Sequence, residues 1–156
     1  MQKKHFFVTI LIFCISFPSF AVGQDIPVIV IAPSKKPQSI STVGSSVTVL
    51  DEKFFEKTND LFLGDVLSNN STSINFFQSG GHGTASAIQL RGLPKRYSTV
   101  YIDGVKMSDP SSVSGDFDFN HILTSQISRV EILKGSQSSV YGSGAIGGTI
   151  NITTKK

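Results

Sequence analysis

A glycine-laced stretch stands close to residue 156, the last of the sequence: Tyr141-Gly142-Ser143-Gly144-Ala145-Ile146-Gly147-Gly148-Thr149-Ile150-Asn151-Ile152. Gly142, Gly144 and Gly147 satisfy the G-x-G-x-x-G pattern of dinucleotide-binding loops, which need a helix directly afterwards because the pyrophosphate binds at a helix N-terminus. The residues that follow are instead dense in β-branched side chains, which favour a strand. We therefore exclude nucleotide binding and predict a strand from Ser139 onward, in which the glycines allow a bulge and close backbone packing.

Upstream of this stretch, the sequence predicts further strands, short helices and long polar loops. Strand-like runs stand at 47–50, 74–77, 87–92, 98–105 and 127–133. Asp103-Gly104 predicts a tight turn within the fourth run. Asp51 is suited to cap a short helix, and Thr58 or Asn59 to cap a second one. The fold class is therefore α+β, with a small mixed β-sheet, short helices and long polar loops of the kind that carry function.

Residues 1–23 have the order of a secretory signal peptide. Lys3 and Lys4 precede a mostly apolar run at 6–17, and small residues follow at Ala21 and Gly23. Cleavage is expected after one of these two small residues. The apolar run is too short to span a bilayer stably, so export is favoured over a retained membrane anchor.

The exported part has a nearly balanced charge. The sequence holds 14 Lys and Arg against 11 Asp and Glu, and removal of Lys3 and Lys4 leaves 12 basic residues. No basic cluster with interleaved aromatics stands in this part, so no nucleic-acid partner is expected.

Cys14 is the only cysteine and leaves with the signal peptide, so disulfides are excluded as well. About 130 residues remain, which is enough for one domain.

Residues 24–45 read as a flexible tail, because prolines and a Ser-Lys-Lys stretch disfavour regular structure. A β-prone run bracketed by prolines lies within this tail. It either adds as a strand to the exposed sheet edge of a partner or forms the first edge strand of the domain itself. The run consists of Asp25, Ile26, Pro27, Val28, Ile29, Val30, Ile31 and Ala32. The folded domain is expected over 46–156.

No set of residues argues for an enzyme. The histidines are scattered without metal-ligand spacing, and no Gly-x-Ser-x-Gly elbow occurs. His82 lies in a glycine-rich loop, where it is either solvated or in contact with a bound ligand. Asp109, Asp116 and Asp118 stand in one polar loop. They could supply oxygens to Ca²⁺, although their spacing is not that of an EF-hand and also suits a solvated loop.

Three charges stand at or just beyond the ends of apolar strands: Arg91, Glu131 and Lys134. Such charges could pair with one another or with opposite charges on a wall against which the domain sits. Ordinary surface ion pairs, each worth at most ~1 kcal/mol, are the alternative.

Four motifs that follow one another along the sequence point to a known family. They are Ile88-Gln89-Leu90-Arg91-Gly92, Val100-Tyr101-Ile102-Asp103-Gly104-Val105, Ile127-Ser128-Arg129-Val130-Glu131-Ile132-Leu133-Lys134-Gly135, and the stretch at 140–152. Together they resemble the plug domain of TonB-dependent outer-membrane receptors, over roughly 47–154. The resemblance implies a small mixed sheet wedged inside a barrel of ~22 strands. It implies a gate for the energised uptake of cobalamin or a ferric siderophore, located in the outer membrane as part of a receptor, or in the periplasm if alone.

The resemblance also implies roles for single residues. The run at 25–32 takes the place of the TonB box, which pairs with an edge strand of the TonB C-terminal domain. Arg91, Glu131 and Lys134 fall where family members place plug charges that dock on the barrel wall. Three loops would contact the ligand, and their residues are Ser79, Gly80, Gly81, His82, Gly83, Thr84, Pro94, Lys95, Arg96, Ser108, Asp109, Ser112, Ser114, Asp116 and Asp118.

The sequence departs from the family pattern at two places. Lys134-Gly135-Ser136 stands where the family usually has Arg-Gly-Pro, which keeps the charge but loses the bidentate fork. The sequence also stops about where the first barrel strand is expected, so a barrel is expected to be separately encoded or lost. A stand-alone periplasmic module that binds ligand or TonB, and a truncated receptor remnant, are the alternatives. The stretch at 109–119 most resembles cobalamin-type receptors, whereas siderophore receptors share much of the framework.

Overall fold

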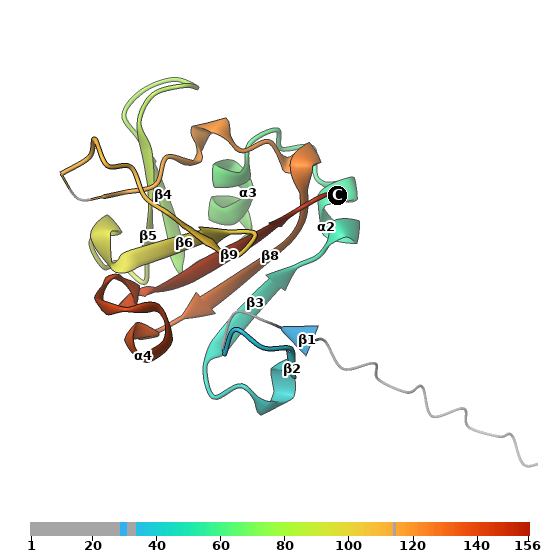
Figure 1. Ribbon diagram of the computed structural model, residues 1–156. Coiled ribbons are helices and arrows are strands. Elements are labelled where there is room, and N and C mark those ends of the chain that lie inside the picture. Colours follow the sequence, from blue (N-terminus) through green and yellow to red (C-terminus); the bar gives the residue numbers. More distant parts are fainter. Residues whose placement is uncertain (1–28, 31–33, 114) are drawn as a thin grey trace, which may run out of the picture.

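A five-stranded mixed sheet forms the centre of the molecule (Figure 1). The structure is a computed structural model and describes residues 29–30, 34–113 and 115–156. The strands follow one another across the sheet as β3 (Ser46–Leu50), β8 (Ile127–Lys134), β9 (Gly148–Thr154), β6 (Ser98–Ile102) and β7 (Val105–Met107). Strand β9 pairs antiparallel with β8 and parallel with β6. The last strand in the sequence is therefore central in the sheet.

The hydrophobic core lies between one face of this sheet and a layer of helices and a hairpin. This layer consists of α2 (Glu52–Lys57), α3 (Leu63–Asn70) and the hairpin of β4 (Ile74–Gln78) with β5 (Ser86–Leu90). Successive side chains of a strand point to opposite faces, and alternate residues of β8 and β9 are accordingly buried in the core. The core includes Leu63, Val66, Leu67, Ile88, Leu90, Val100, Val130, Ile132, Ile150 and Ile152.

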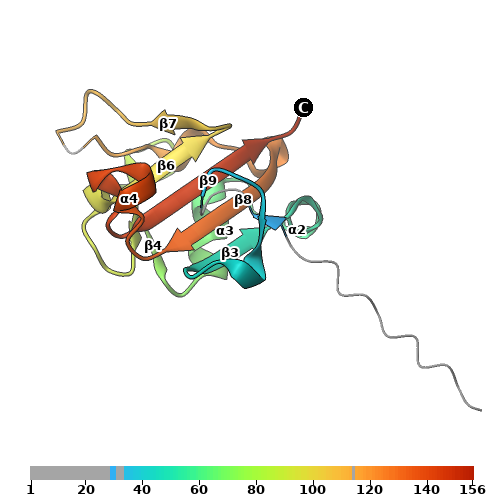
Figure 2. The same ribbon diagram turned by 60° about the horizontal axis from the view of Figure 1, so that its bottom comes forward.

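The opposite face, here called the outer face, carries Tyr101, Glu131, Asn151 and Thr153 by the same alternation. It is partly covered by short elements that come from both ends of the described chain (Figure 2). These elements are β1 (Ile29–Val30), β2 (Gln38–Ser39), η1 (Ile40–Thr42), α4 (Ser138–Tyr141) and η5 (Ser143–Ala145). Three further 3-10 turns are η2 (Lys95–Tyr97), η3 (Phe119–His121) and η4 (Thr124–Gln126).

The α+β class and the predicted strands upstream of residue 134 are confirmed. The Asp51 cap is confirmed too, because its carboxylate accepts a hydrogen bond of 3.0 Å from the Phe54 amide. Asp103 and Gly104 have φ values of 49° and 84°. Both lie in the left-handed region, as a two-residue hairpin turn requires, and they join β6 to β7.

Two predicted elements are wrong in their extent. The second helix begins at Leu63, with Phe62 and not Thr58 or Asn59 at its N-cap. Long-range bonds hold the preceding backbone extended, since the Leu63 amide donates to the Ile122 carbonyl and the Thr124 amide to the Leu61 carbonyl, each at 3.0 Å. Propensity alone does not contain such a tertiary contact.

The predicted strand from Ser139 begins only at Gly148. The residues before it form α4 and η5, which are separated by Gly142 with a φ of 86°. A strand and not a helix follows the G-x-G-x-x-G pattern, as expected. The glycines also permit close packing as predicted, because a Cβ on Gly148 would overlap the Leu133 carbonyl oxygen.

Part of the predicted tail is ordered within the chain. Strand β1 pairs antiparallel with β2, and Val30 is fully buried. The other residues of the predicted TonB-pairing run, at 25–28 and 31–32, lie outside the described residues, as does the predicted signal peptide. Among the described residues, no helix is long and apolar enough to cross a membrane.

Candidate functional site

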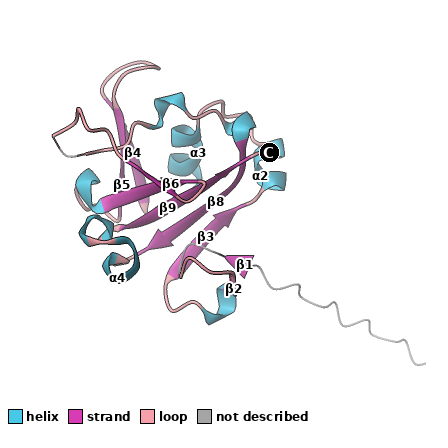
Figure 3. Ribbon diagram, viewed as in Figure 1, coloured by secondary structure: helices cyan, strands magenta, loops and turns pink. Residues whose placement is uncertain are grey.

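The residues predicted to contact a ligand lie in three connections of the fold. The first joins β4 to β5, the second contains η2 directly before β6, and the third follows β7. Figure 3 shows the first and third loops extending from the body of the domain on the side away from β1 and β2. Ser114 in the third loop lies outside the described residues.

An ion pair joins the second loop to the third. The Lys95 ammonium lies 2.5 Å from the Asp116 Oδ2 atom, and the side chains are 48% and 7% exposed, respectively. Because the carboxylate is largely shielded from water, the attraction is screened less than that of an exposed pair. The other oxygen of Asp116, Oδ1, is buried and has no hydrogen-bond partner among the described residues. The position of the third loop therefore depends on Lys95.

Hydrogen bonds join the first loop to the third. The Ser86 hydroxyl donates to Asp118 Oδ1 at 2.6 Å, and the Asn120 side-chain amide donates to the Thr84 carbonyl. Burial alone would raise the pKa of Asp118, but hydrogen bonds from Ser86 and Asn120, together with the nearby His121, hold it below its ordinary value. The third loop is therefore joined to the second by an ion pair and to the first by hydrogen bonds.

His82 is not a freely solvated side chain. Its ring stacks on Phe62, with the ring centroids 4.9 Å apart and the planes 25° from parallel. This contact fixes the tip of the first loop against the segment that leads into α3.

The three aspartates predicted as possible Ca²⁺ ligands do not converge on one point. Asp109 accepts hydrogen bonds from the Ser111 hydroxyl at 2.6 Å and amide at 2.8 Å, which lower its pKa. Asp116 and Asp118 have the separate partners described above. In the part of the chain that the structure describes, no three His, Cys, Asp or Glu residues are grouped to hold a metal ion. Calcium binding stays a prediction for which the geometry gives no support.

An open cavity of about 510 Å³ lies beside the third loop. Its polar lining residues are Ser108, Asp109, Asp118 and His121, and Met107 and Phe117 contribute apolar surface. A mixture of apolar surface and a few polar groups is also found in small-molecule sites.

The three charges predicted to dock on a barrel wall are divided between two places. A Cβ built on Gly135 would lie 3.3 Å from Arg91 Nη1, so the Arg91 guanidinium lies beside the 134–135 segment. Glu131, in contrast, is only 2% exposed, lies on the outer face, and accepts a hydrogen bond of 2.9 Å from Arg129 Nε. The structure therefore places the Arg91 guanidinium beside the backbone that follows Lys134, and the Glu131 side chain on the outer face of the sheet.

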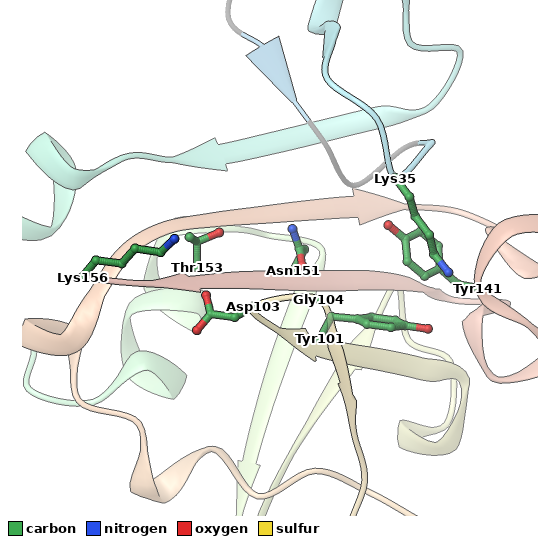
Figure 4. Close-up of a pocket in the computed structure, with 8 residues that line it drawn as sticks. All are labelled: Lys35, Tyr101, Asp103, Gly104, Tyr141, Asn151, Thr153 and Lys156. Carbon is green, nitrogen blue, oxygen red and sulfur yellow. The ribbon is translucent and has the colours of Figure 1, made fainter.

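A second cavity, of about 500 Å³, lies on the outer face and was not predicted (Figure 4). Tyr101 and Tyr141 line one end of it, with their ring centroids 4.9 Å apart. Burial, assisted by the charges of Tyr101 and Glu131, raises the pKa of Tyr141 to about 12. Lys35 extends over both rings, as Figure 4 shows. The sequence could have placed Tyr101 on the outer face, because it alternates along β6 with the core residue Val100. Its contact with Tyr141 could not be predicted in this way, because it depends on the tertiary fold.

The mixed sheet, the helix-and-hairpin layer and the linked loops define a plug domain. Residues 39–149 match the family model described as TonB-dependent Receptor Plug Domain. This match covers more than half of the sequence. The chain belongs to the TonB-dependent receptor plug family.

Particular relatives are transporters and receptors. The chain is 35% identical to the vitamin B12 transporter BtuB of Vibrio vulnificus over 126 residues. The aligned residues make up 81% of this chain and 20% of that protein. It resembles the ferric yersiniabactin uptake receptor FyuA of Yersinia pestis, with a TM-score of 0.54, 28% identity and coverage of 72% and 17% of the two chains. The fold is also that of a domain in P. aeruginosa FpvA bound to pyoverdine, with a TM-score of 0.64, 21% identity and coverage of 82% and 16%. The chain spans about a fifth of the length of the curated relative.

Proposed function

We propose that this chain is the plug of a TonB-dependent receptor in the outer membrane, where it gates the energised uptake of a chelated nutrient. Its membership of the plug family carries the proposal. The three predicted ligand loops support it, because the Lys95–Asp116 ion pair and hydrogen bonds at their ends join them into one surface that a ligand can contact. The named relatives are a transporter and uptake receptors, which supports transport over catalysis.

Cobalamin is the nutrient that the observations favour. The relative at 35% identity is a vitamin B12 transporter. The cavity beside the third loop holds two carboxylates, Asp109 and Asp118, with His121. Carboxylates accept hydrogen bonds from the amide groups that surround the corrin ring, whereas they repel an anionic chelate. A ferric siderophore, as taken up by the structural neighbour of Yersinia pestis, is the alternative ligand.

Two partners follow from the same proposal. The run at 25–32 pairs with the C-terminal domain of TonB by adding a strand to an exposed sheet edge. Arg91 and Lys134 dock the plug on the wall of a β-barrel. The Arg91 guanidinium lies beside Gly135, the residue directly after Lys134, and this supports a joint role because charges that come from one region of the plug can meet one acidic patch.

The test of this function joins the chain to the barrel of the Vibrio vulnificus relative, in cells without a cobalamin transporter of their own. Deletion of 25–32 should abolish cobalamin uptake and leave binding of cobalamin to the cells nearly unchanged, because the ligand loops are untouched. A variant with eight Gly and Ser residues in place of 25–32 keeps the length and should fail in the same way. Uptake that persists in both variants would contradict the assignment.

A further inference from the structure

The cavity on the outer face is separate from the three predicted ligand loops. None of the described residues that line it belongs to those loops. Figure 4 shows Asn151 and Thr153 of β9 between Lys156 at one end of the cavity and the pair of Tyr101 and Tyr141 at the other. The volume of about 500 Å³ falls in the range of small-molecule sites. A ligand of this cavity would therefore differ from the one that the loops contact.

The charged side chains that line this cavity are mainly basic. Lys35 and Lys156 lie at opposite ends of it, as Figure 4 shows, and Asp103 is the acidic residue among its described lining residues. Both carboxylate oxygens of Asp103 already accept hydrogen bonds from Thr154, at 3.0 Å from the amide and 2.7 Å from the hydroxyl. The cavity therefore offers two cations, whereas the charge of its aspartate is engaged within the chain.

The strand residues around the cavity add to this positive charge. Lys106 stands directly opposite Tyr101 in the pair of β6 with β7, so both residues share the outer face. Glu131 stands opposite Asn151 on the same face, but it accepts a hydrogen bond of 2.9 Å from Arg129, and these two charges largely cancel. An anion that approaches the outer face therefore meets an excess of positive charge.

The Lys35 ammonium is positioned to hold an anion. It lies 5.8 Å from the ring centroid of Tyr101 and 5.0 Å from that of Tyr141, which are cation–π distances. The rings orient the ammonium but do not neutralise its charge. In the part of the chain that the structure describes, no carboxylate lies within ion-pair distance of Lys35. A bound anion would supply that partner through a charge-assisted hydrogen bond, which is the stronger kind.

The neutral groups of the cavity suit an anion that carries an apolar body. The Asn151 amide and the Thr153 hydroxyl can donate hydrogen bonds, and Tyr101 and Tyr141 contribute aromatic surface. Burial, assisted by the charges of Tyr101 and Glu131, raises the pKa of Tyr141 to about 12. This phenol therefore stays neutral at ordinary pH and adds no negative charge that would repel an anion.

We propose that the outer-face cavity binds a small organic phosphate, with the phosphate held by Lys35 and by the polar side chains of β9, and with the apolar body against Tyr101 and Tyr141. A phosphate has three strong acceptor oxygens, which match the ammonium, the amide and the hydroxyl that line the cavity. The same chemistry occurs in free phosphomonoesters and in phospholipid headgroups. The proposal does not depend on the transport function proposed above, because the two cavities share no lining residue.

Nuclear magnetic resonance titration of the full chain with phenyl phosphate tests this site. The backbone amide signals of Tyr101, Asn151 and Thr153 should shift saturably, and those of the three predicted ligand loops should not move. Inorganic phosphate lacks the apolar body and should bind about fivefold more weakly. Benzyl alcohol lacks the anion and should give no saturable shift. Absence of saturable shifts with phenyl phosphate, or shifts confined to the ligand loops, overturns the proposal.

Variants of the lining residues show whether the cavity makes the predicted contacts. Lys35→Gln removes the cation and should weaken phenyl phosphate binding about tenfold, as expected for the loss of a hydrogen bond between charged groups. Thr153→Val removes a neutral donor at nearly constant volume and should weaken binding about threefold. Lys36→Gln is the matched control, because Lys36 does not line the cavity, and should bind as wild type. Equal affinities of Lys35→Gln and Lys36→Gln overturn the assignment of Lys35.

A second titration distinguishes the two sources of the phosphate. Dihexanoyl phosphatidylglycerol, used below its micelle concentration, presents a phospholipid headgroup to the same cavity. Tighter binding of this lipid than of phenyl phosphate identifies a headgroup as the ligand, and tighter binding of phenyl phosphate identifies a free phosphomonoester. Either result supports the site if Lys35→Gln weakens the tighter ligand. A tighter ligand that Lys35→Gln leaves unaffected contradicts the proposal.

Discussion

The Lys95 ammonium and the Asp116 carboxylate, 2.5 Å apart, join two loops that the sequence predicts to contact the same ligand. These residues are separated by strands β6 and β7 and by most of a polar loop. Their pairing turns two neighbouring loops into one surface. The surface that the sequence predicts for a ligand is therefore partly organised by the chain itself.

Replacing Lys95 alone should lower the free energy of unfolding more than replacing both Lys95 and Asp116. Lys95→Met leaves the buried Asp116 carboxylate without its cation, and we expect a loss of about 1 kcal/mol in the free energy of unfolding. Water reaches the half-exposed lysine and limits the effect. The double variant with Asp116→Asn should recover roughly half of that loss, because no charge is left unpaired. Urea unfolding measures both, and Arg96→Met, the neighbouring cation, is the control. Equal losses in Lys95→Met and Arg96→Met would contradict a specific pair.

Gly148 should not tolerate any side chain. A Cβ there would overlap the Leu133 carbonyl oxygen and lie 2.9 Å from Leu90 Cδ1, and its φ is 147°. Since the obstacle is backbone in the central sheet, Gly148→Ala is expected to cost more than about 4 kcal/mol. Gly44→Ala is the matched control, because nothing lies within 4 Å of its Cβ position. Circular dichroism and thermal melting should show a folded control and a largely unfolded variant. A melting temperature of Gly148→Ala near that of wild type would show that this strand is placed wrongly.

Tyr141 should make the fold less stable at high pH. Its pKa is raised to about 12 in the folded chain, whereas an unfolded tyrosine titrates near about 10. The folded state therefore holds the proton more tightly, and the contribution of this group is fully present below pH ~10 and lost as the pH rises towards ~12. Melting temperatures measured from pH 8 to 12 should fall less steeply for Tyr141→Phe than for wild type. Parallel curves would mean that the phenol is not buried.

The cap of α2 should be replaceable by another hydrogen-bond acceptor. Asp51→Ala removes the 3.0 Å bond from the Phe54 amide and should destabilise the fold by about 1 kcal/mol. Asp51→Ser keeps an acceptor at the N-cap and should lose only a few tenths of that value. Urea denaturation distinguishes the two variants. The cap assignment is wrong if alanine and serine give the same midpoint.

Local patterns were sufficient for most of the framework. The alternating residues of β8, the Asp103-Gly104 turn and the Asp51 cap act within a few residues, so their chemistry can be read directly from the sequence. The start of α3 could not be predicted in this way. It is determined by hydrogen bonds to residues 122–124, which are about 60 positions away.

Only part of the candidate site could be predicted from the sequence, because the rest of it depends on contacts between distant residues. The three loops proposed to contact a ligand were predicted from the family resemblance, and the structure shows how side chains join them. The burial of Glu131 and its bond to Arg129 depend on which face of the sheet a strand residue occupies and on what covers that face. The contact of Lys35 with Tyr101 and Tyr141 joins three distant segments, and no local pattern contains it.

The central place of β9 has a consequence for how the protein is made. Strands β8 and β6 have no direct pairing with each other and are joined only through β9, which follows all the other strands that the structure describes. A ribosome that has not yet reached Gly148 therefore holds a polypeptide whose sheet lacks its middle member. Such a nascent chain cannot yet form the five-stranded sheet, so the domain completes its fold only after residues 148–154 have been made.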